Sequence, residues 1–115
     1  CHACDVLHTG PLADERLRAE VAKLESVQLD MWSDEPVVTP QGKRTTAREW
    51  AHELGLFYAP AMVFFDESGN EVMRVDAVTQ FYRLLGVFDY INKRAYEYER
   101  NYQSWRLSRR EIIRN

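Results

Sequence analysis

The stretch Tyr58-Ala-Pro-Ala-Met-Val-Phe-Phe-Asp66 contributes most to the fold prediction for this chain of 115 residues. Residues 61–65 form a short apolar run, which is typical of a buried strand. Pro60 stands just before this run, where a proline removes one hydrogen-bond donor from the sheet. Because an X–Pro bond is the one place where a cis peptide costs little, Pro60 indicates either a special backbone geometry or simply a rigid strand start.

The residues after this strand predict a hairpin and a long helix. Glu67-Ser-Gly-Asn70 is typical of a turn in which Gly69 takes a positive φ, so residues 71–75 are expected to pair back on residues 61–65. Farther along, large apolar side chains recur at helical spacing and predict an amphipathic helix; they are Phe81, Leu84, Leu85, Phe88 and Ile91.

The residues before the strand predict a helix with defined ends. Thr46 and Glu49 fit a capping box, in which each side chain bonds a backbone N–H at the helix start. Gly55 is well placed to end this helix. Its buried face is expected to consist of Ala47, Trp50, Ala51 and Leu54.

Nearer the start of the chain, the pattern predicts helix, then strand, then loop. Residues 4–8 can be helical until Gly10-Pro11 interrupts them, and Asp14 can cap a second helical segment with the apolar face Leu17, Val21 and Leu24. Residues 27–31 alternate as in a strand, and the prolines of residues 33–44 predict a loop. The resulting order of elements is helix, strand, helix, strand, strand, helix, which predicts an α/β sandwich with a mixed sheet.

Composition and charge limit the class of protein. Hydrophobic residues make up 45% and charged residues 29%, as in a folded globular chain of one-domain size. No uninterrupted apolar stretch approaches the roughly 20 residues of a membrane-spanning helix. Residues 1–91 hold 8 Lys and Arg against 15 Asp and Glu, and residues 92–115 hold 7 against 3. The acidic body argues against nucleic acid as the main partner.

The basic segment 92–115 is expected to be a helical extension that continues through Ala95, Tyr98, Tyr102 and Trp105. Its aromatic side chains either pack back on the domain under the stems of the interleaved arginines, or form with those arginines a docking surface for a protein partner or a weak nucleic-acid patch. We favour packing on the domain.

The strongest chemical signal is Cys1-His-Ala-Cys4. Two intervening residues at a helix start let the two sulfurs reach disulfide distance, and they place the first sulfur near unpaired N–H groups and the positive end of the helix dipole. Both effects favour the thiolate form of Cys1, which attacks disulfides, while Cys4 is suited to resolve the mixed disulfide. His2 lies between them and can stabilise the thiolate further.

Other interpretations of the cysteine pair exist. A lone C-x-x-C can be half of a zinc site, but structural zinc needs four ligands, and only His2, His8 and His52 could join the cysteines as imidazole ligands. A c-type haem motif needs histidine directly after the second cysteine, where Asp5 stands. His52 is expected to be a solvated surface residue. His8, one turn beyond Cys4, could face the dithiol, but a tuning role is not expected for it.

These residues together resemble the thioredoxin superfamily, through C-x-x-C at Cys1 and Cys4, the Ala59-Pro60 dipeptide leading into an apolar strand, and the Asp66 to Val72 hairpin. The segment Gln41-Gly-Lys-Arg-Thr-Thr46 and the aromatic tail look most like the SoxW-type extracytoplasmic thioredoxin-like group. The resemblance spans residues 1 to about 91 and implies a thioredoxin-like domain there, followed by the extension at 92–115. It also implies a periplasmic or otherwise extracytoplasmic location.

The resemblance implies a role for each matching residue. Cys1 would be the exposed nucleophile and Cys4 the resolving thiol, with His2 and Pro60 tuning the redox chemistry. Pro60 would be a cis-proline facing the dithiol, and the backbone of Ala59, together with Pro60, would bind an extended substrate segment by β-augmentation. Partners would be proteins with cysteines and a protein electron donor or acceptor, with no cofactor beyond the two sulfurs.

Two departures from the family pattern matter. The residue before the proline is commonly threonine, and here Ala59 lacks that hydroxyl near the thiolate. Family members also carry a central strand directly before the C-x-x-C, and this chain begins at Cys1 with no signal-peptide pattern. We therefore expect the chain to be a piece of a longer protein that supplies the strand.

The predicted function is thiol–disulfide exchange with protein cysteines. Two other classes compete with it. One is a binding module of the same fold that holds copper or zinc through the two cysteines, and the other is an interaction domain without catalysis.

Overall fold

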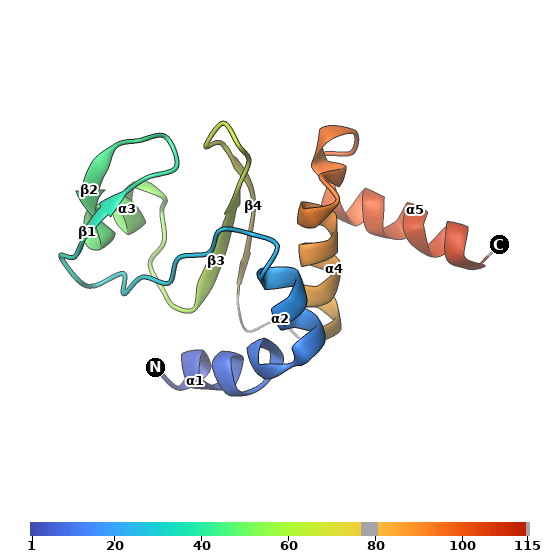
Figure 1. The fold of residues 1–115 in the computed structure, drawn as a ribbon, viewed down its shortest axis with the longest axis horizontal. Helices are drawn as coiled ribbons and strands as arrows, with labels where there is room; N and C mark the ends of the chain where they lie inside the picture. The colour runs from blue at the N-terminus through green and yellow to red at the C-terminus, as the bar shows by residue number, and fades with distance from the viewer. Residues whose placement is uncertain (77–80, 115) are drawn as a thin grey trace. The chain divides into compact units, whose positions relative to one another are not determined.

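The computed structural model describes residues 1–76 and 81–114, and these fall into two units (Figure 1). Residues 1–7 and 27–76 form the first unit, and residues 8–26 and 81–114 form the second. The first unit therefore consists of two separate stretches of the chain. The domain boundary expected at residue 91 remains a prediction. Among the described residues no helix is both long and apolar enough to cross a membrane.

The first unit contains short strands and two helices. Helix α1 begins in it, and its last two residues belong to the second unit. The elements are α1 (His2–Thr9), β1 (Pro36–Val38), β2 (Arg44–Thr46), α3 (Ala47–Glu53), β3 (Ala61–Phe65) and β4 (Glu71–Asp76).

The predicted hairpin is confirmed as the antiparallel pair β3–β4, with Ala61 opposite Asp76 and Phe64 opposite Met73. In its turn, Gly69 has φ +84°, and its N–H donates to the carbonyl oxygen of Asp66 over 3.0 Å. A side chain at this position would be blocked, because a Cβ would lie 3.0 Å from the backbone of Pro40. The turn residues and the apolar run together explain why the local sequence predicts this element well.

Helix α3 begins and ends where the sequence predicts. The hydroxyl of Thr46 accepts a hydrogen bond from the N–H of Glu49 at 3.2 Å, and Gly55 takes φ +74° just after the helix. The reciprocal half of the capping box differs, since the Glu49 carboxylate accepts from the hydroxyl of Thr45. Trp50 stacks on Phe65 with ring centroids 5.7 Å apart, so α3 packs against β3.

The prediction of a strand at residues 27–31 is wrong. These residues form no ladder, and Val27 is exposed. Instead, β1 lies within the predicted loop of residues 33–44 and pairs antiparallel with β2, which begins at Arg44, the last residue of that loop. Pro36 is the first residue of β1, where a missing N–H is tolerated, and Gly42 takes φ +87° in the turn between the strands. The alternation of apolar and polar residues alone therefore gave a wrong prediction, because a strand needs a pairing partner as well as a pattern.

The α/β class is confirmed, but the sheet differs from the single mixed sheet that we expected. The described strands form two separate antiparallel pairs, β1–β2 and β3–β4. A parallel pairing would require another strand, and residues 27–31 do not supply it. Each observed pair is closed by a short turn, which brings its strands together at little entropic cost.

The second unit is helical, and its core lies between α2 and α4. Leu17 of α2 and Leu84 and Val87 of α4 are fully buried. Asp14 caps α2 as predicted, accepting from the N–H of Arg16 at 2.8 Å. The side chain of Phe81, predicted to face the core, lies outside the described residues. The elements are η1 (Pro11–Ala13), α2 (Glu15–Val21), α4 (Phe81–Asn92), η2 (Ala95–Glu97) and α5 (Tyr102–Arg114).

The helix predicted to run on beyond residue 91 is interrupted. Helix α4 ends at Asn92, and Arg94 takes a left-handed φ of +54°, which a continuing helix cannot contain. The chain then turns through η2 before α5 begins. The predicted packing of the tail aromatics is confirmed for Tyr102 and Trp105, whose rings lie 5.3 and 5.2 Å from that of Tyr90.

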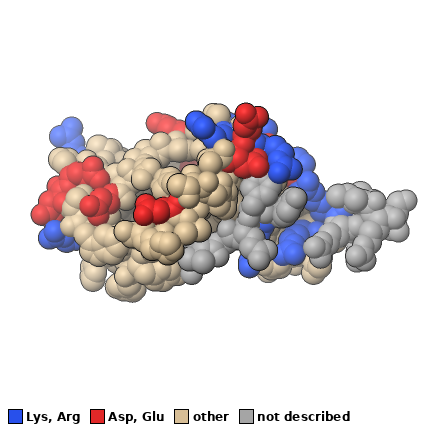
Figure 2. Space-filling view, turned by 90° about the horizontal axis from the view of Figure 1, so that it is seen from below, with Lys and Arg blue, Asp and Glu red and all other residues tan. Residues whose placement is uncertain are grey.

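Charge is distributed unevenly between the two units. On the face seen in Figure 2, Asp and Glu side chains gather over the part of the first unit that holds β1, β2 and α3. Lys and Arg side chains gather over the helices of the second unit. Arg109 forms an ion pair with Asp89 and lies over the ring of Trp105, so some of this basic charge is used within the unit.

The contact between Asn92 and Glu20 should make stability depend on pH. The side-chain amide of Asn92 donates to the Glu20 carboxylate at 2.7 Å, and Lys23 pairs with it at 3.0 Å. The hydrogen bond from Asn92, and next the one from Lys23, lowers the pKa of Glu20 below its ordinary value of 4.5. The unfolded chain therefore binds the proton first, so this stabilisation is present above pH 4.5 and is lost as the pH falls through the lower folded-state pKa.

The expected result is that Glu20→Gln loses less free energy of unfolding between pH 7 and pH 3 than the unmodified protein does. Urea unfolding at the two pH values measures this difference. Glu25→Gln, at an exposed position, serves as the matched control and should keep the full acid loss. An acid loss in Glu20→Gln equal to that of the unmodified protein would contradict the assignment.

Candidate functional site

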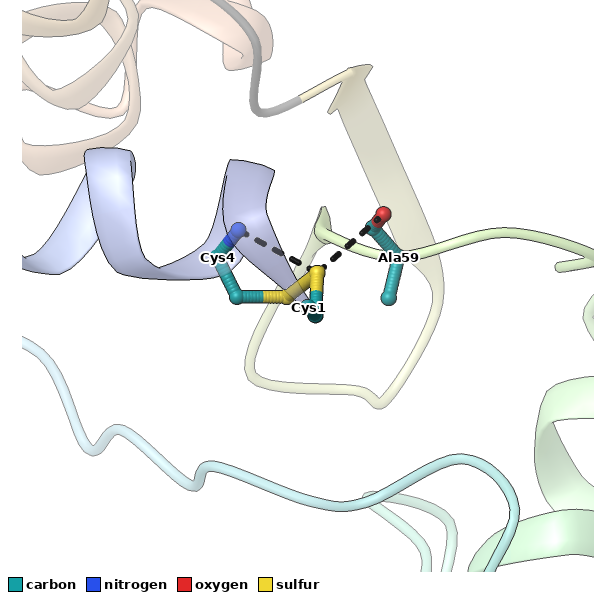
Figure 3. The surroundings of a disulfide bond; sticks show 3 residues. All are labelled: Cys1, Cys4 and Ala59. Atoms are coloured by element: carbon teal, nitrogen blue, oxygen red, sulfur yellow. Dashed lines mark hydrogen bonds between the residues drawn. A yellow bond between two sulfur atoms is a disulfide. The ribbon is translucent and has the colours of Figure 1, made fainter.

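The two cysteines form a disulfide at the start of α1 (Figure 3). Their Cα atoms lie 5.2 Å apart, within the usual range for such bonds. Helix α1 begins at His2, and the N–H of Asp5 donates to the carbonyl oxygen of Cys1 at 3.2 Å. Cys1 therefore occupies the capping position of the helix, and Cys4 lies in its first turn.

The backbone around Cys1 favours negative charge on its sulfur. The N–H of Cys4 points at Cys1 Sγ over 3.2 Å, as an N–H of a first helical turn does toward a capping side chain. When the disulfide is reduced, the same N–H and the positive end of the helix dipole face the sulfur of Cys1. Cys1 is exposed and Cys4 is half-buried, so the sulfur best placed to be charged is also the more accessible one.

A loop from far along the chain lies beside the disulfide. The carbonyl oxygen of Ala59 is 3.8 Å from Cys1 Sγ, although the two residues are 58 positions apart in sequence. The Ala59–Pro60 peptide bond is cis, and β3 begins at the next residue. A disulfide sulfur carries no proton, so in this oxidised state the approach is a contact, and the thiol of reduced Cys1 can donate across it. The site thus brings together Cys1, Cys4 and the carbonyl of Ala59, the residue bonded to Pro60 (Figure 3).

The three histidines lie in different surroundings. His2 is the first residue of α1, between the cysteines, and is exposed. His52 is exposed on α3, as predicted, in a shallow pocket with Arg48, Glu49 and Glu53. His8 is exposed and belongs to the second unit. Within the part of the chain that the structure describes, no three His, Cys, Asp or Glu residues gather as a metal site.

Two residues next to Ala59 were not singled out from the sequence. Phe57 and Tyr58 are large aromatic residues, and both are exposed. They stand two positions and one position before Ala59, so they lie on the same loop as the carbonyl that approaches Cys1. Their signal in the sequence is a pair of aromatic residues in a segment that otherwise has the residues of a turn.

Comparison with known proteins identifies the family. No curated protein and no solved structure matches this chain. The sequence model of one protein family, described as a thioredoxin-like domain, matches residues 1–92. The matched region includes the cysteine pair, the cis-proline and the β3–β4 hairpin, which are the features described above. The chain belongs to the thioredoxin-like domain family.

Proposed function

We propose that this protein is a thiol–disulfide oxidoreductase that exchanges disulfides with cysteines of other proteins. The observation that carries the proposal is the Cys1–Cys4 disulfide at the start of α1, with the N–H of Cys4 directed at the exposed sulfur of Cys1. Membership of the thioredoxin-like family supports the same chemistry. Cys1 is the attacking residue in this proposal, and Cys4 resolves the intermediate.

Exchange with a substrate disulfide takes two steps. The Cys1 thiolate attacks one substrate sulfur, the substrate S–S bond breaks, and the other substrate sulfur leaves as a thiolate that takes up a proton. Cys4 then loses its proton and attacks the sulfur of Cys1, so the Cys1–Cys4 bond forms and the second substrate sulfur leaves. Two electrons pass from the dithiol to the substrate, and a partner dithiol protein must return them. The reverse sequence forms a disulfide in the substrate.

The loop at Ala59 and Pro60 is proposed to hold the substrate. Its support is the closeness of the Ala59 carbonyl to Cys1, because a segment whose cysteine reaches Cys1 Sγ also reaches this backbone. Main-chain hydrogen bonds of an added strand give affinity with little dependence on sequence. The resemblance to the SoxW-type group supports a finer proposal, namely an extracytoplasmic location, where oxidising conditions let disulfides persist.

Equilibration with mixtures of reduced and oxidised glutathione tests the proposal directly. The expected result is one reversible two-electron transition of the Cys1–Cys4 pair, with a potential between about −270 mV, typical of a reductant, and about −120 mV, typical of an oxidant. Alkylation of free thiols and mass measurement give the oxidised fraction. A protein that forms no intramolecular disulfide at any ratio would overturn the proposal, and stoichiometric copper or zinc uptake by that protein would identify a metal-binding module instead.

His2 is proposed to tune this potential. It lies between the two cysteines at the start of α1, where a charged or hydrogen-bonding imidazole stabilises the thiolate of the reduced form. His2→Ala should therefore make the pair harder to reduce, by about 30 mV, or roughly 1.4 kcal/mol for two electrons. His52→Ala is the matched control, since that exposed histidine lies on α3. Equal potentials for His2→Ala and the unmodified protein would contradict a tuning role.

A further inference from the structure

We infer that Phe57 and Tyr58 are the specificity-determining surface of this site, and that they select unfolded polypeptide segments with a large apolar side chain near the reacting cysteine. The inference rests on the proposed disulfide exchange and adds the substrate class to it. Phe57 is 74% exposed and Tyr58 is 57% exposed. Single apolar residues scattered over a surface need no explanation, but these two are adjacent and belong to the loop beside the disulfide.

The backbone that presents the two aromatic residues is held on both sides. Before them, the N–H of Leu56 donates to the carbonyl oxygen of Ala51 at 2.9 Å, and Arg74 donates to that of Leu54 at 2.7 Å. After them, β3 begins at Ala61, which is paired with β4. The aromatic pair is therefore presented by a preorganised segment, so a ligand that binds it loses little free energy to ordering the loop.

The pair directly precedes the residue whose carbonyl oxygen approaches Cys1. Tyr58 directly precedes Ala59, whose carbonyl oxygen is 3.8 Å from Cys1 Sγ. Consecutive residues of an extended chain advance by about 3.3 Å, so a residue one or two positions from the substrate cysteine is displaced by about 3–7 Å. Tyr58 and Phe57 stand one and two positions before Ala59 along the loop, so each has a counterpart among these substrate residues.

The chemistry of the pair indicates which segment it prefers. Aromatic rings gain most by covering apolar side chains, and each large apolar group removed from water contributes roughly 1.5–3 kcal/mol when burial is complete. Cysteine is among the most buried residues of folded proteins, where its neighbours are apolar as well. A cysteine that reaches Cys1 with such neighbours exposed therefore comes from a chain that is unfolded or only partly folded.

Two peptides of equal length test the inference. Each carries one cysteine in a mixed disulfide with glutathione, with phenylalanine two residues to either side in one peptide and serine there in the other; glutathione disulfide is a third substrate. The reduced protein is expected to have a kcat/KM about tenfold higher for the phenylalanine peptide, equivalent to partial burial of one aromatic side chain. In the double variant Phe57→Ser with Tyr58→Ser, this preference should fall to about one.

Val38→Ser is the matched control, because Val38 is 66% exposed and lies on β1 of the same unit. This variant should keep the tenfold preference. The inference is overturned if the double variant also keeps it, or if the unmodified protein shows none. If kcat/KM of the double variant falls equally on all three substrates, the pair acts through the dithiol. If the melting temperature of the double variant falls markedly, the pair serves to stabilise the fold. Either result overturns the inference. Absence of exchange with every substrate would instead refute the proposed function, and the inference with it.

Discussion

Replacing Cys1 by serine is expected to abolish disulfide exchange, whereas Cys4→Ser should accumulate as a mixed disulfide with its substrate. The reason is the different placement of the two sulfurs. Cys1 is exposed, accepts from the N–H of Cys4 and lies beside the Ala59 carbonyl, so in the proposed mechanism it is the sulfur that meets the substrate. Cys4 is half-buried in the first turn of α1, where it reaches the Cys1 sulfur and is proposed to break the mixed disulfide.

For the first variant, the measurement is the rate at which a protein disulfide is reduced, monitored by the release of free thiols. This rate should fall to that of unassisted exchange. Non-reducing electrophoresis with mass measurement detects the trapped complex of the second. The Cys1→Ser variant with its free Cys4 controls for non-specific thiol reactivity and should trap far less. Retained turnover in Cys1→Ser, or trapping through Cys4 rather than Cys1, would show that the roles are assigned wrongly. A metal-binding pair predicts a different pattern, namely loss of metal in both variants without any trapped complex.

The largest expected effect on stability comes from Tyr90→Ala. Tyr90 is 1% exposed, and its ring contacts those of Tyr96, Tyr102 and Trp105 at centroid distances of 6.3, 5.3 and 5.2 Å. Its hydroxyl donates to the carbonyl oxygen of Glu99 at 2.5 Å. Truncation leaves a cavity between α4 and α5, and large aromatic-to-alanine changes in a core cost about 3–5 kcal/mol of the free energy of unfolding.

Tyr90→Phe separates the two contributions of this side chain, because it keeps the ring and removes the hydroxyl. It should cost about 1–3 kcal/mol, since the Glu99 carbonyl loses its partner. Tyr98 belongs to the same unit and is 74% exposed. Tyr98→Ala is therefore the matched control and should change stability by no more than about 0.5 kcal/mol. Urea unfolding followed by circular dichroism measures all three. A loss below about 1 kcal/mol for Tyr90→Ala would show that the aromatic cluster does not hold α5 on α4.

Parts of this protein that depend on neighbouring residues could be predicted from the sequence. The β3–β4 hairpin, the cap of α3 at Thr46 and its end at Gly55 each follow from a few adjacent side chains and from backbone angles that only certain residues adopt. The cysteine pair is equally local, because two intervening residues in a helical turn bring the sulfurs together whatever the rest of the chain does.

The errors arose where a distant partner or a single backbone angle decided the outcome. Residues 27–31 alternate like a strand but have no ladder, whereas Pro36 begins a strand that pairs across a tight turn. The tail has the apolar spacing of a helix that continues, yet Arg94 adopts a left-handed conformation that redirects the chain. No periodic pattern reports either event, because a pattern describes the preference of a segment and not the surface available to it.

The sequence by itself determined which residues make up the site, namely two cysteines at a helix start and a proline before an apolar strand. It also determined the family, of which both features are typical. What only the tertiary structure decided is the meeting of residues 58 positions apart, which places the Ala59 carbonyl 3.8 Å from Cys1, and the exposure of Phe57 and Tyr58 beside it. The physical reason is that residue type and spacing determine the backbone conformation only over a few neighbouring residues. Proximity and burial depend on the packing of the first unit, to which distant parts of the chain contribute together.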